Sequence, residues 1–221
     1  MRKTTSSPAK IGRPVDPRKQ RAMLCAAQKH FLTYGLERST MDGIAADAEV
    51  SKATLYAHYT SKEALFQHMI RAKCTEYTPP DFFHELHPLP PRKALERFSL
   101  NLMQLVLSPE VVALYRVIVS ETGRNPQIGL LFYEAGPMNV KSYVVALLEH
   151  YKKNRLLKFQ DGFMAVEMLG SMLLNEPHMR CIMGFAPAPN EKAMKKHAKF
   201  CVDIFLTYFG TKKLRATEAR T

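Results

Sequence analysis

Helical periodicity is the feature that most limits how this chain can fold. Apolar residues recur at intervals of three and four along most of its length, and β-branched residues do not alternate with polar ones. A three-to-four repeat puts apolar side chains on one face of an α-helix, whereas a half-buried strand repeats every second residue. Glycine, which weakens helices, accounts for only 10 of the 221 residues. The sequence therefore predicts an all-α protein.

Start and stop signals divide the chain into separate helices. Asp16-Pro17 combines an N-cap with a proline at the first helical position, and Gly35 is a typical stop. Gly136-Pro137 lies in a region that is otherwise helical, where the proline should kink or split the helix. After residue 91 we expect helices at 92–107, 109–123, 126–153, 161–184 and 190–209, with Gly210 as the last stop.

Three short helices should follow the first one in quick succession. Capping residues place two of them at about 40–48 and 51–57, and Thr60-Ser61-Lys62-Glu63 is a capping box that opens the next. The prolines between 79 and 91 then predict an irregular connection, the best candidate for a boundary between two modules. We expect His84-Glu-Leu-His87, which is one residue short of a zinc-protease pattern, to be a loop in this connection.

Residues 40–59 have the spacing of a helix-turn-helix. Ile44 and the neighbouring alanines give the first helix a small apolar face, Val50 fills the corner, and Leu55 anchors the second helix. The remaining positions of the second helix are short, polar or aromatic. Few of these side chains suit a core, and a helix that lies in a DNA major groove requires this kind of surface.

This motif resembles the tetracycline-repressor (TetR) family of bacterial transcriptional regulators. The family has a Thr before the motif, I-A-x-x-A-G-V-S-x-x-T-L-Y-x-H-F within it and S-K-E-x-L after it, and this chain matches at Thr40, 44–59 and 61–65. Glu49 replaces the family Gly, and a non-glycine residue at positive φ costs about 1 kcal/mol, so the turn should be slightly remodelled. Tyr59 replaces the family Phe and adds a hydroxyl that is able to contact a phosphate.

A second resemblance lies farther along the chain. Val119-Ser-Glu121 and Leu131–Pro137 are similar to the AefR-like class of C-terminal domains in that family. The resemblance implies an all-helical fold, with a three-helix DNA-binding module followed by a helical bundle that binds a ligand and forms a dimer. We expect a basic flexible arm at 1–15, a helix-turn-helix domain at 16–60, a ligand-binding and dimerisation domain at 61–210 with helix 61–77 as connector, and a basic tail at 211–221.

The resemblance also implies which residues contact DNA. The implied set includes Tyr56, His58 and Tyr59, whose alternative role is packing between the third and fourth helices. The tripeptide Gly12-Arg13-Pro14 is typical of minor-groove hooks, in which Arg13 would lie along an A·T-rich groove, and the alternative is a solvated basic tail. The implied contacts are Thr40 on a phosphate, Ser51, Lys52, Ala53 and Thr54 facing the groove, and Tyr56, His58, Tyr59 and Lys62 on the flanking phosphates.

Apolar and aromatic residues of the C-terminal part are candidates for a ligand pocket and a dimer interface. The pocket set is Phe98, Leu102, Leu105, Tyr115, Val119, Glu121, Phe132 and Tyr133, for which the alternative is plain core packing. Glu121 or Glu134 is able to attract a cationic ligand, whereas His178 and His197 stand alone and are expected to be structural or exposed. The dimer set is Met168, Met172, Phe200, Ile204 and Phe205, enough for a four-helix bundle with a second copy.

The net charge of +12 is concentrated at the two ends of the chain. Residues 1–38 carry nine basic and two acidic side chains, residues 39–75 carry four of each, and residues 186–221 carry eight and three. A basic excess favours a polyanionic partner such as nucleic acid or an acidic membrane face. We expect the N-terminal share to hold phosphates and the C-terminal share to be solvated surface.

Other classes of protein find little support in the sequence. The longest run without a charged residue is Phe98–Pro109, twelve residues against the roughly 20 that span a bilayer, and the first residues do not form a secretory signal. We therefore expect a cytoplasmic protein with no membrane partner. No nucleotide-binding or catalytic motif is present, so neither a cofactor nor enzymatic activity is expected. The cysteines, Cys25, Cys74, Cys181 and Cys201, form no C-x-x-C pair, which argues against a metal site or a disulfide framework.

The sequence thus predicts a ligand-responsive transcriptional regulator, most simply a dimeric repressor that binds a palindromic operator. Its expected partners are double-stranded operator DNA, a small-molecule effector that releases the DNA, and a second copy of the chain. One alternative is a transcriptional activator of the same fold. Another is a nucleoid-type or membrane-surface protein that uses its basic ends nonspecifically, whose binding would be indifferent to sequence and would vanish with salt.

Overall fold

The computed structural model describes residues 16–79 and 81–219. Within these ranges there is no strand, and Leu157 and Gly210 form an isolated antiparallel bridge, so the all-α prediction is confirmed. The helices are α1 (Pro17–Arg38), α2 (Met41–Asp47), α3 (Lys52–His58), α4 (Lys62–Tyr77), α5 (Phe82–Leu86), α6 (Pro91–Val106), α7 (Pro109–Thr122), α8 (Pro126–Ala135), α9 (Pro137–Lys153), α10 (Gly162–Met183), α11 (Glu191–Phe209) and α12 (Lys212–Glu218).

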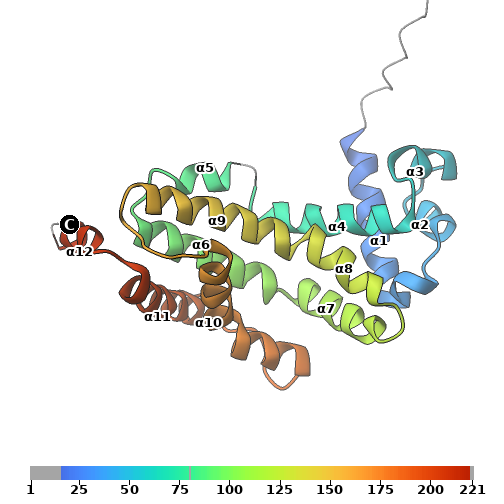
Figure 1. Ribbon diagram of the computed structural model, residues 1–221. Helices are drawn as coiled ribbons and strands as arrows, with labels where there is room; N and C mark the ends of the chain where they lie inside the picture. Colours follow the sequence, from blue (N-terminus) through green and yellow to red (C-terminus); the bar gives the residue numbers. More distant parts are fainter. Residues whose placement is uncertain (1–15, 80, 220–221) are drawn as a thin grey trace, which may run out of the picture.

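The helices are arranged in two groups. Figure 1 shows α1, α2 and α3 gathered at one end of the molecule, α12 at the other end, and α4 running from the first group along the second. We call α1–α3 the head and α5–α12 the body. Among the described residues no single helix has both the length and the apolar character to span a membrane, although α6 and α7 meet those criteria as a pair bent by 63°.

Side-chain caps explain where the first four helices begin. The Asp16 carboxylate accepts the backbone N–H of Arg18 at 2.9 Å, at the start of α1. Thr40, Ser51 and Ser61 accept the N–H three residues ahead at the starts of α2, α3 and α4, each at 3.1 Å. Each cap satisfies a backbone donor that has no partner within the helix. The predicted starts are therefore confirmed.

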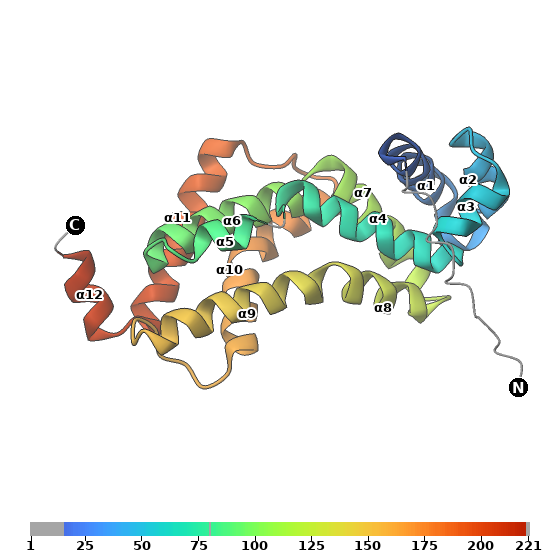
Figure 2. The same cartoon turned by 90° about the horizontal axis from the view of Figure 1, so that it is seen from above.

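Glycine and proline break two of the helices as the sequence predicts. Gly35 has φ 78° and ψ 171° and interrupts α1 one turn before its end at Arg38. Gly136 separates α8 from α9, and Pro137 is the first residue of α9, so the expected helix 126–153 is split in two. Figure 2 shows α8 and α9 following each other along one side of the molecule.

Two hydrophobic clusters hold the fold together. One fills the body and joins α6, α9, α10 and α11 through fully buried residues such as Leu95, Leu147, Leu173 and Val202. The other lies under the head and extends beyond it, since it also contains residues of α4, α7 and α8. Its members include Phe31, Ile44, Leu55, Phe66, Leu114, Ile118 and Ile128. The head therefore shares its core with the connector helix and with two helices of the body.

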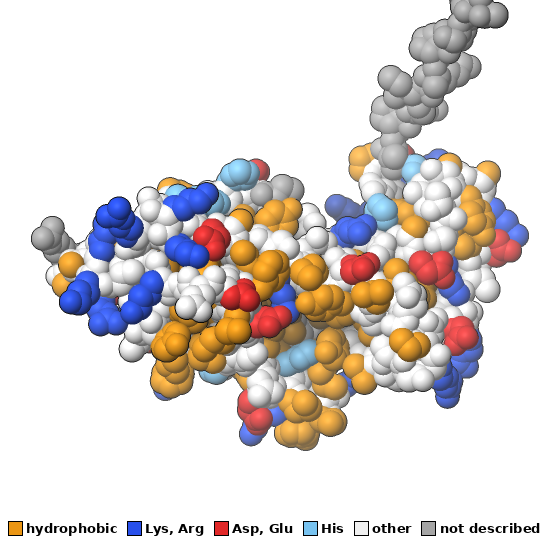
Figure 3. Space-filling view, in the orientation of Figure 1, with side chains coloured by type: hydrophobic (Ala, Val, Ile, Leu, Met, Phe, Trp, Pro, Cys, Tyr) orange, Lys and Arg blue, Asp and Glu red, His pale blue; other side chains and the backbone are white. Residues whose placement is uncertain are grey.

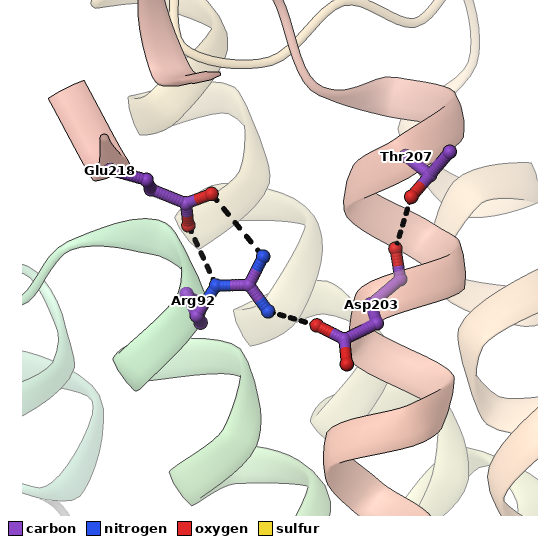
Figure 4. Close-up of polar contacts among 4 residues, drawn as sticks. All are labelled: Arg92, Asp203, Thr207 and Glu218. Carbon is purple, nitrogen blue, oxygen red and sulfur yellow. Dashed lines mark hydrogen bonds and ion pairs between the residues drawn. The ribbon is translucent and has the colours of Figure 1, made fainter. Parts of the chain in front are cut away.

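The irregular connection and the basic tail both contain a helix that the sequence analysis did not predict. Phe82 and Leu86 are buried, and one turn of helix, α5, is what brings residues four apart to the same face, so the expected loop at 84–87 is corrected. At the other end, Leu214 of α12 is buried. Arg92 of α6 pairs with both Asp203 of α11 and Glu218 of α12 (Figure 4), which fixes α12 to the body.

Candidate nucleic-acid interface

The helix-turn-helix is built on one small apolar contact. Ile44 and Ala45 of α2 and Leu55 of α3 are buried against each other in the head cluster. The turn between the helices is closed by backbone hydrogen bonds from Glu49 to Ala46 and from Val50 to Ala45, both 3.0 Å. Glu49 has φ 53°, so the position that is glycine in the TetR family keeps its left-handed conformation with a glutamate in place.

The opposite side of α3 faces solvent. Lys52, Ala53 and Tyr56 are exposed, and Tyr56 has an exposed fraction of 50%. The Lys52 ammonium lies 2.5 Å from the carboxylate of Asp42 in α2, so both charges are at this surface. Of the other residues expected to contact DNA, Thr40 and Ser51 are exposed caps, whereas Thr54 and His58 are half-buried. The structure therefore leaves half of the predicted set exposed, namely Thr40, Ser51, Lys52, Ala53 and Tyr56.

Tyr59 does not lie on this face, which corrects its expected phosphate contact. Only 3% of its surface is exposed, and its ring packs edge-on against His68 of α4 with centroids 5.2 Å apart. Burial raises the pKa of the Tyr59 hydroxyl, an effect that the neighbouring Gln20 side chain opposes. Tyr59 is a core residue between α3 and α4, the alternative that the sequence left open for it.

Lys62 contacts the backbone of its own chain. Its ammonium donates to the backbone carbonyl oxygens of Glu37 at 2.8 Å and Ser39 at 3.0 Å. These carbonyls belong to the end of α1 and the segment after it, where helix acceptors lack partners. Lys62 therefore ties the start of α4 to the end of α1, and these contacts favour a structural role over the implied phosphate contact, which stays a prediction.

The start of α1 adds basic residues that sequence reasoning did not assign individually. Arg18, Lys19 and Arg21 are exposed in its first turn and a half. The local excess of positive charge in residues 1–38 was the signal that pointed to them. Arg13, the expected minor-groove residue, lies outside the described residues.

The expected ligand-lining residues separate into three groups. Phe98 and Leu105 are buried in the protein core, and Val119 and Tyr133 are on the surface, so these four do not line a common pocket. Lys141 lies over the Tyr133 ring, 5.3 Å from its centroid. Leu102, Tyr115 and Phe132 are half-buried. Phe98 is enclosed, and does not line a pocket, because α6 packs its apolar face against α11.

Tyr115 and Phe132 meet a histidine that sequence reasoning left without a role. The rings of Tyr115 and Phe132 are 5.9 Å apart, and the ring of His178 from α10 is 4.7 Å from that of Tyr115. The Nε2 atom of His178 is buried and has no hydrogen-bond partner among the described residues. Burial lowers the pKa of His178, which favours the neutral imidazole. Histidine on an apolar helix gave no sequence signal for this cluster.

Glu121, expected to attract a ligand, contacts the head instead. Its carboxylate accepts the backbone N–H of Leu36 at 3.0 Å, across the junction between α7 and α1. A cleft of about 580 Å³ lies at this junction, and its lining includes Tyr34, Arg38, Glu121 and Arg124. Glu134, the other acidic candidate, is exposed on α8.

Of the expected dimer residues, three are exposed, one is half-buried and one lies in the core. Met168, Phe200 and Ile204 are exposed on α10 and α11, where Phe200 has an exposed fraction of 62%, and Met172 is half-buried. Phe205 is 1% exposed and packs against Phe209 with ring centroids 4.6 Å apart, so it belongs to the core of its own chain. Figure 3 shows hydrophobic side chains gathered on the lower side of the body in that view.

A helix-turn-helix head with an exposed second helix, joined to an all-helical body, defines a DNA-binding transcriptional regulator. Residues 24–69 match the family described as bacterial regulatory proteins, tetR family, and residues 93–211 match the AefR-like transcriptional repressor, C-terminal domain. The chain belongs to the TetR family of transcriptional regulators, with a C-terminal domain of the AefR-like class. It is accordingly a regulator and not an enzyme.

Individual relatives agree with this assignment. A TetR regulator from Agrobacterium tumefaciens is 25% identical with a TM-score of 0.73, over 91% of this chain and 99% of that one. The flavonoid-responsive regulator FrrA is 31% identical with a TM-score of 0.69, over 89% of this chain and 100% of that one. The HTH-type transcriptional regulator YdeS of Bacillus subtilis (strain 168) is 38% identical over 71 residues, so the match spans 32% of this chain and 36% of YdeS.

Proposed function

We propose that this protein is a cytoplasmic repressor that binds a palindromic operator as a dimer and is released by a small-molecule effector. The observation that carries the proposal is the outer face of α3, where Lys52, Ala53 and Tyr56 are exposed while Leu55 fixes the opposite side to α2. A short helix presented in this way fits a major groove, and Ala53 allows close approach while Lys52 and Tyr56 carry groups that can donate hydrogen bonds. Arg13 remains our proposed minor-groove contact.

The exposed apolar surface of α10 and α11 supports a dimer. Met168, Phe200 and Ile204 would be buried against the same residues of a second copy in a four-helix bundle. We expect the double substitution Phe200→Glu with Ile204→Glu to convert the protein from dimer to monomer in sedimentation velocity. Tyr143→Glu, on the exposed side of α9, is the matched control and should leave the dimer intact. A monomeric wild-type protein would contradict this part of the proposal.

Tyr115, Phe132 and His178 are our proposed effector contacts. Two aromatic rings beside a neutral imidazole with a free nitrogen suit a planar aromatic ligand that carries a hydroxyl group. FrrA, 31% identical, is described as flavonoid-responsive, which favours the same chemical class here. We expect a hydroxylated flavonoid such as quercetin to raise the melting temperature of the wild-type protein but not that of His178→Phe. An equal rise in both proteins would exclude His178 as a contact.

Effector release is an allosteric step in this proposal. Two DNA-reading heads must lie about 34–36 Å apart to enter successive major grooves on one side of a duplex. A ligand that prefers a conformation with a different spacing lowers DNA affinity by the ratio of its affinities for the two conformations. The hydrophobic cluster that α4, α7 and α8 share with the head is the physical connection between the two sites.

The test of DNA recognition is a gel-shift titration at several salt concentrations. The probes are the intergenic DNA upstream of the protein's own gene and a random duplex of the same length. A repressor of the proposed kind binds the first at least about 10³-fold more tightly at physiological salt. Equal affinity for the two probes, lost steeply with salt, would instead support the nonspecific nucleoid-type alternative. Transcription from the bound promoter in vitro separates a repressor from an activator.

A further inference from the structure

One segment, Gly35–Thr40, contains the last turn of α1 and the link to α2, and it is held by a side chain from the body. The backbone N–H of Leu36 donates to Oε2 of Glu121 at 3.0 Å. Glu121 lies in the last turn of α7, and its own carbonyl accepts the N–H groups of Arg124 and Asn125 at 2.9 Å, which closes that helix. The carboxylate therefore extends from a well-terminated helix of the body to the backbone of the head.

Gly35 is an independent sign that this contact is built into the fold. Its φ of 78° belongs to the left-handed region, which favours glycine. In addition, a Cβ atom at Gly35 would collide with the carboxylate of Glu121. Glycine at this position thus suits the backbone conformation, and the lack of a Cβ atom also lets the Glu121 carboxylate reach Leu36 in the position observed.

The other side of the same segment is held by α4. The Lys62 ammonium donates to the carbonyl oxygens of Glu37 and Ser39, and the Ser39 hydroxyl donates to the carbonyl of Gly35 at 2.5 Å. An acid from α7 thus holds an N–H of the segment, and a base from α4 holds its carbonyls. Both contacts are made by charged groups, which form stronger hydrogen bonds than neutral ones.

We propose that Glu121 is a positioning residue for DNA binding, and that its contact with Leu36 fixes the head on α7. The inference rests on the function proposed above, because it concerns the spacing of two heads in a dimer. Thr40 ends the held segment and caps α2, and α2 carries α3, so a displacement of α7 is transmitted to the recognition helix. Ile118, one turn before Glu121, lies in the head cluster and supports the same path.

The first experiment measures the contact itself. Amide hydrogen exchange at Leu36 is compared in the wild-type dimer, Glu121→Gln and Glu121→Ala, with Glu134→Ala as the control acid on α8. Removal of a charged acceptor should speed exchange at Leu36 by about tenfold or more in Glu121→Ala, and less in Glu121→Gln, which keeps an acceptor oxygen. The control should exchange at the wild-type rate. Unchanged exchange in Glu121→Ala overturns the proposal.

The second experiment asks whether the contact sets the spacing of the heads. DNA affinity is measured for the native operator and for operators with one base pair inserted or removed between the half-sites. We expect Glu121→Ala to bind the native operator about tenfold more weakly and to discriminate less between the three spacings, because loosely held heads adapt to each. A purely structural loss would lower all three affinities by the same factor, and that result also overturns the proposal.

Gly35→Ala provides a cross-check through a double-mutant cycle. Alone it should weaken operator binding, whereas in the Glu121→Ala background its further effect should be smaller, because the collision with the carboxylate is gone. Additive effects contradict a direct contact. If the wild-type protein prefers no DNA site, the proposed function is overturned. If the wild-type protein prefers its operator and Glu121→Ala keeps the same preference at every spacing, only the positioning role is overturned.

Discussion

Two lysines that occupy the same position in consecutive helices make different contacts, and this difference gives a sharp prediction. Lys52 is the first residue of α3 and is exposed at the proposed DNA surface. Lys62 is the first residue of α4, and its ammonium donates to the carbonyls of Glu37 and Ser39. We predict that Lys62→Met lowers stability and leaves the salt dependence of DNA binding unchanged, whereas Lys52→Met does the reverse.

The size of the stability effect follows from the two hydrogen bonds of Lys62. A hydrogen bond that involves a charged group contributes about 1.5–3 kcal/mol when it is protected from water. Lys62 is half-buried, and solvent screening reduces the two bonds together to about 1–2 kcal/mol. Methionine keeps the packing of the aliphatic stem, so the loss is that of the ammonium contacts. For a chain of this length each kcal/mol changes the melting temperature by about 2–4 °C, which gives a fall of about 2–8 °C.

Thermal unfolding measures the loss of stability. The protein concentration is kept fixed, because the melting temperature of a dimer depends on concentration. Operator affinity at several salt concentrations measures the salt dependence of DNA binding, and each phosphate contact contributes about 0.9 to the steepness of log K against log salt concentration. Lys52→Met removes a positive charge from the proposed DNA surface, so it should make the salt dependence shallower by at most the roughly 0.9 per head that one phosphate contact contributes, and change the melting temperature by less than about 1 °C. If Lys62→Met lowers the slope and leaves the melting temperature unchanged, Lys62 is a phosphate contact and the reasoning is refuted.

Three further predictions follow from single residues. Glu49→Gly should raise the free energy of unfolding by up to about 1 kcal/mol in a urea titration, because φ 53° is unfavourable for glutamate, and a loss of stability would contradict this. Burial lowers the pKa of His178, so the unfolded chain binds a proton at this residue at a higher pH than the folded chain, and stability should fall as the pH decreases below about 6.5. His178→Phe should flatten this fall between about pH 7.5 and 5.5. Parallel stability curves for the two proteins would exclude His178 as the cause. Arg92→Met removes the ion pair by which α6 holds Glu218, so hydrogen exchange should become faster in 212–218 only. Slow exchange there would show that the buried Leu214 and the contacts of Lys213 and Arg215 with backbone carbonyls hold α12 without Arg92.

Helix boundaries were predictable from the sequence because the interactions that set them are local. The caps at Asp16, Thr40, Ser51 and Ser61 bond to backbone groups two or three residues away, and each is visible as a residue type at a fixed spacing. The break at Gly136-Pro137 is local in the same way, since proline removes a donor within its own helix. None of these features depends on what the helix packs against.

The direction of individual side chains was not predictable for the opposite reason. Phe200 and Phe205 are both apolar residues of α11, yet Phe200 is exposed and Phe205 is buried against the body. Periodicity reveals that α11 has apolar residues on more than one side, but only the position of α6 decides which side is internal. The burial of Tyr59 was not predictable for the same reason, since it depends on the position of α4. The Glu121 contact needs a backbone group 85 residues away in the chain, which no local pattern contains.

The arrangement of charge in the fold sharpens what the net charge of +12 means. Figure 1 places α12 at the opposite end of the molecule from α3, and Figure 3 shows Lys and Arg side chains gathered at that far end. Screening at physiological salt limits electrostatic attraction to about 8 Å, so these charges do not act on DNA held by α3 of the same chain. We therefore expect attraction to the phosphates to come from the N-terminal share, in which Arg18, Lys19 and Arg21 are exposed at the start of α1 in the head. In the proposed function, nonspecific affinity and base reading therefore come from different segments of one end of the molecule.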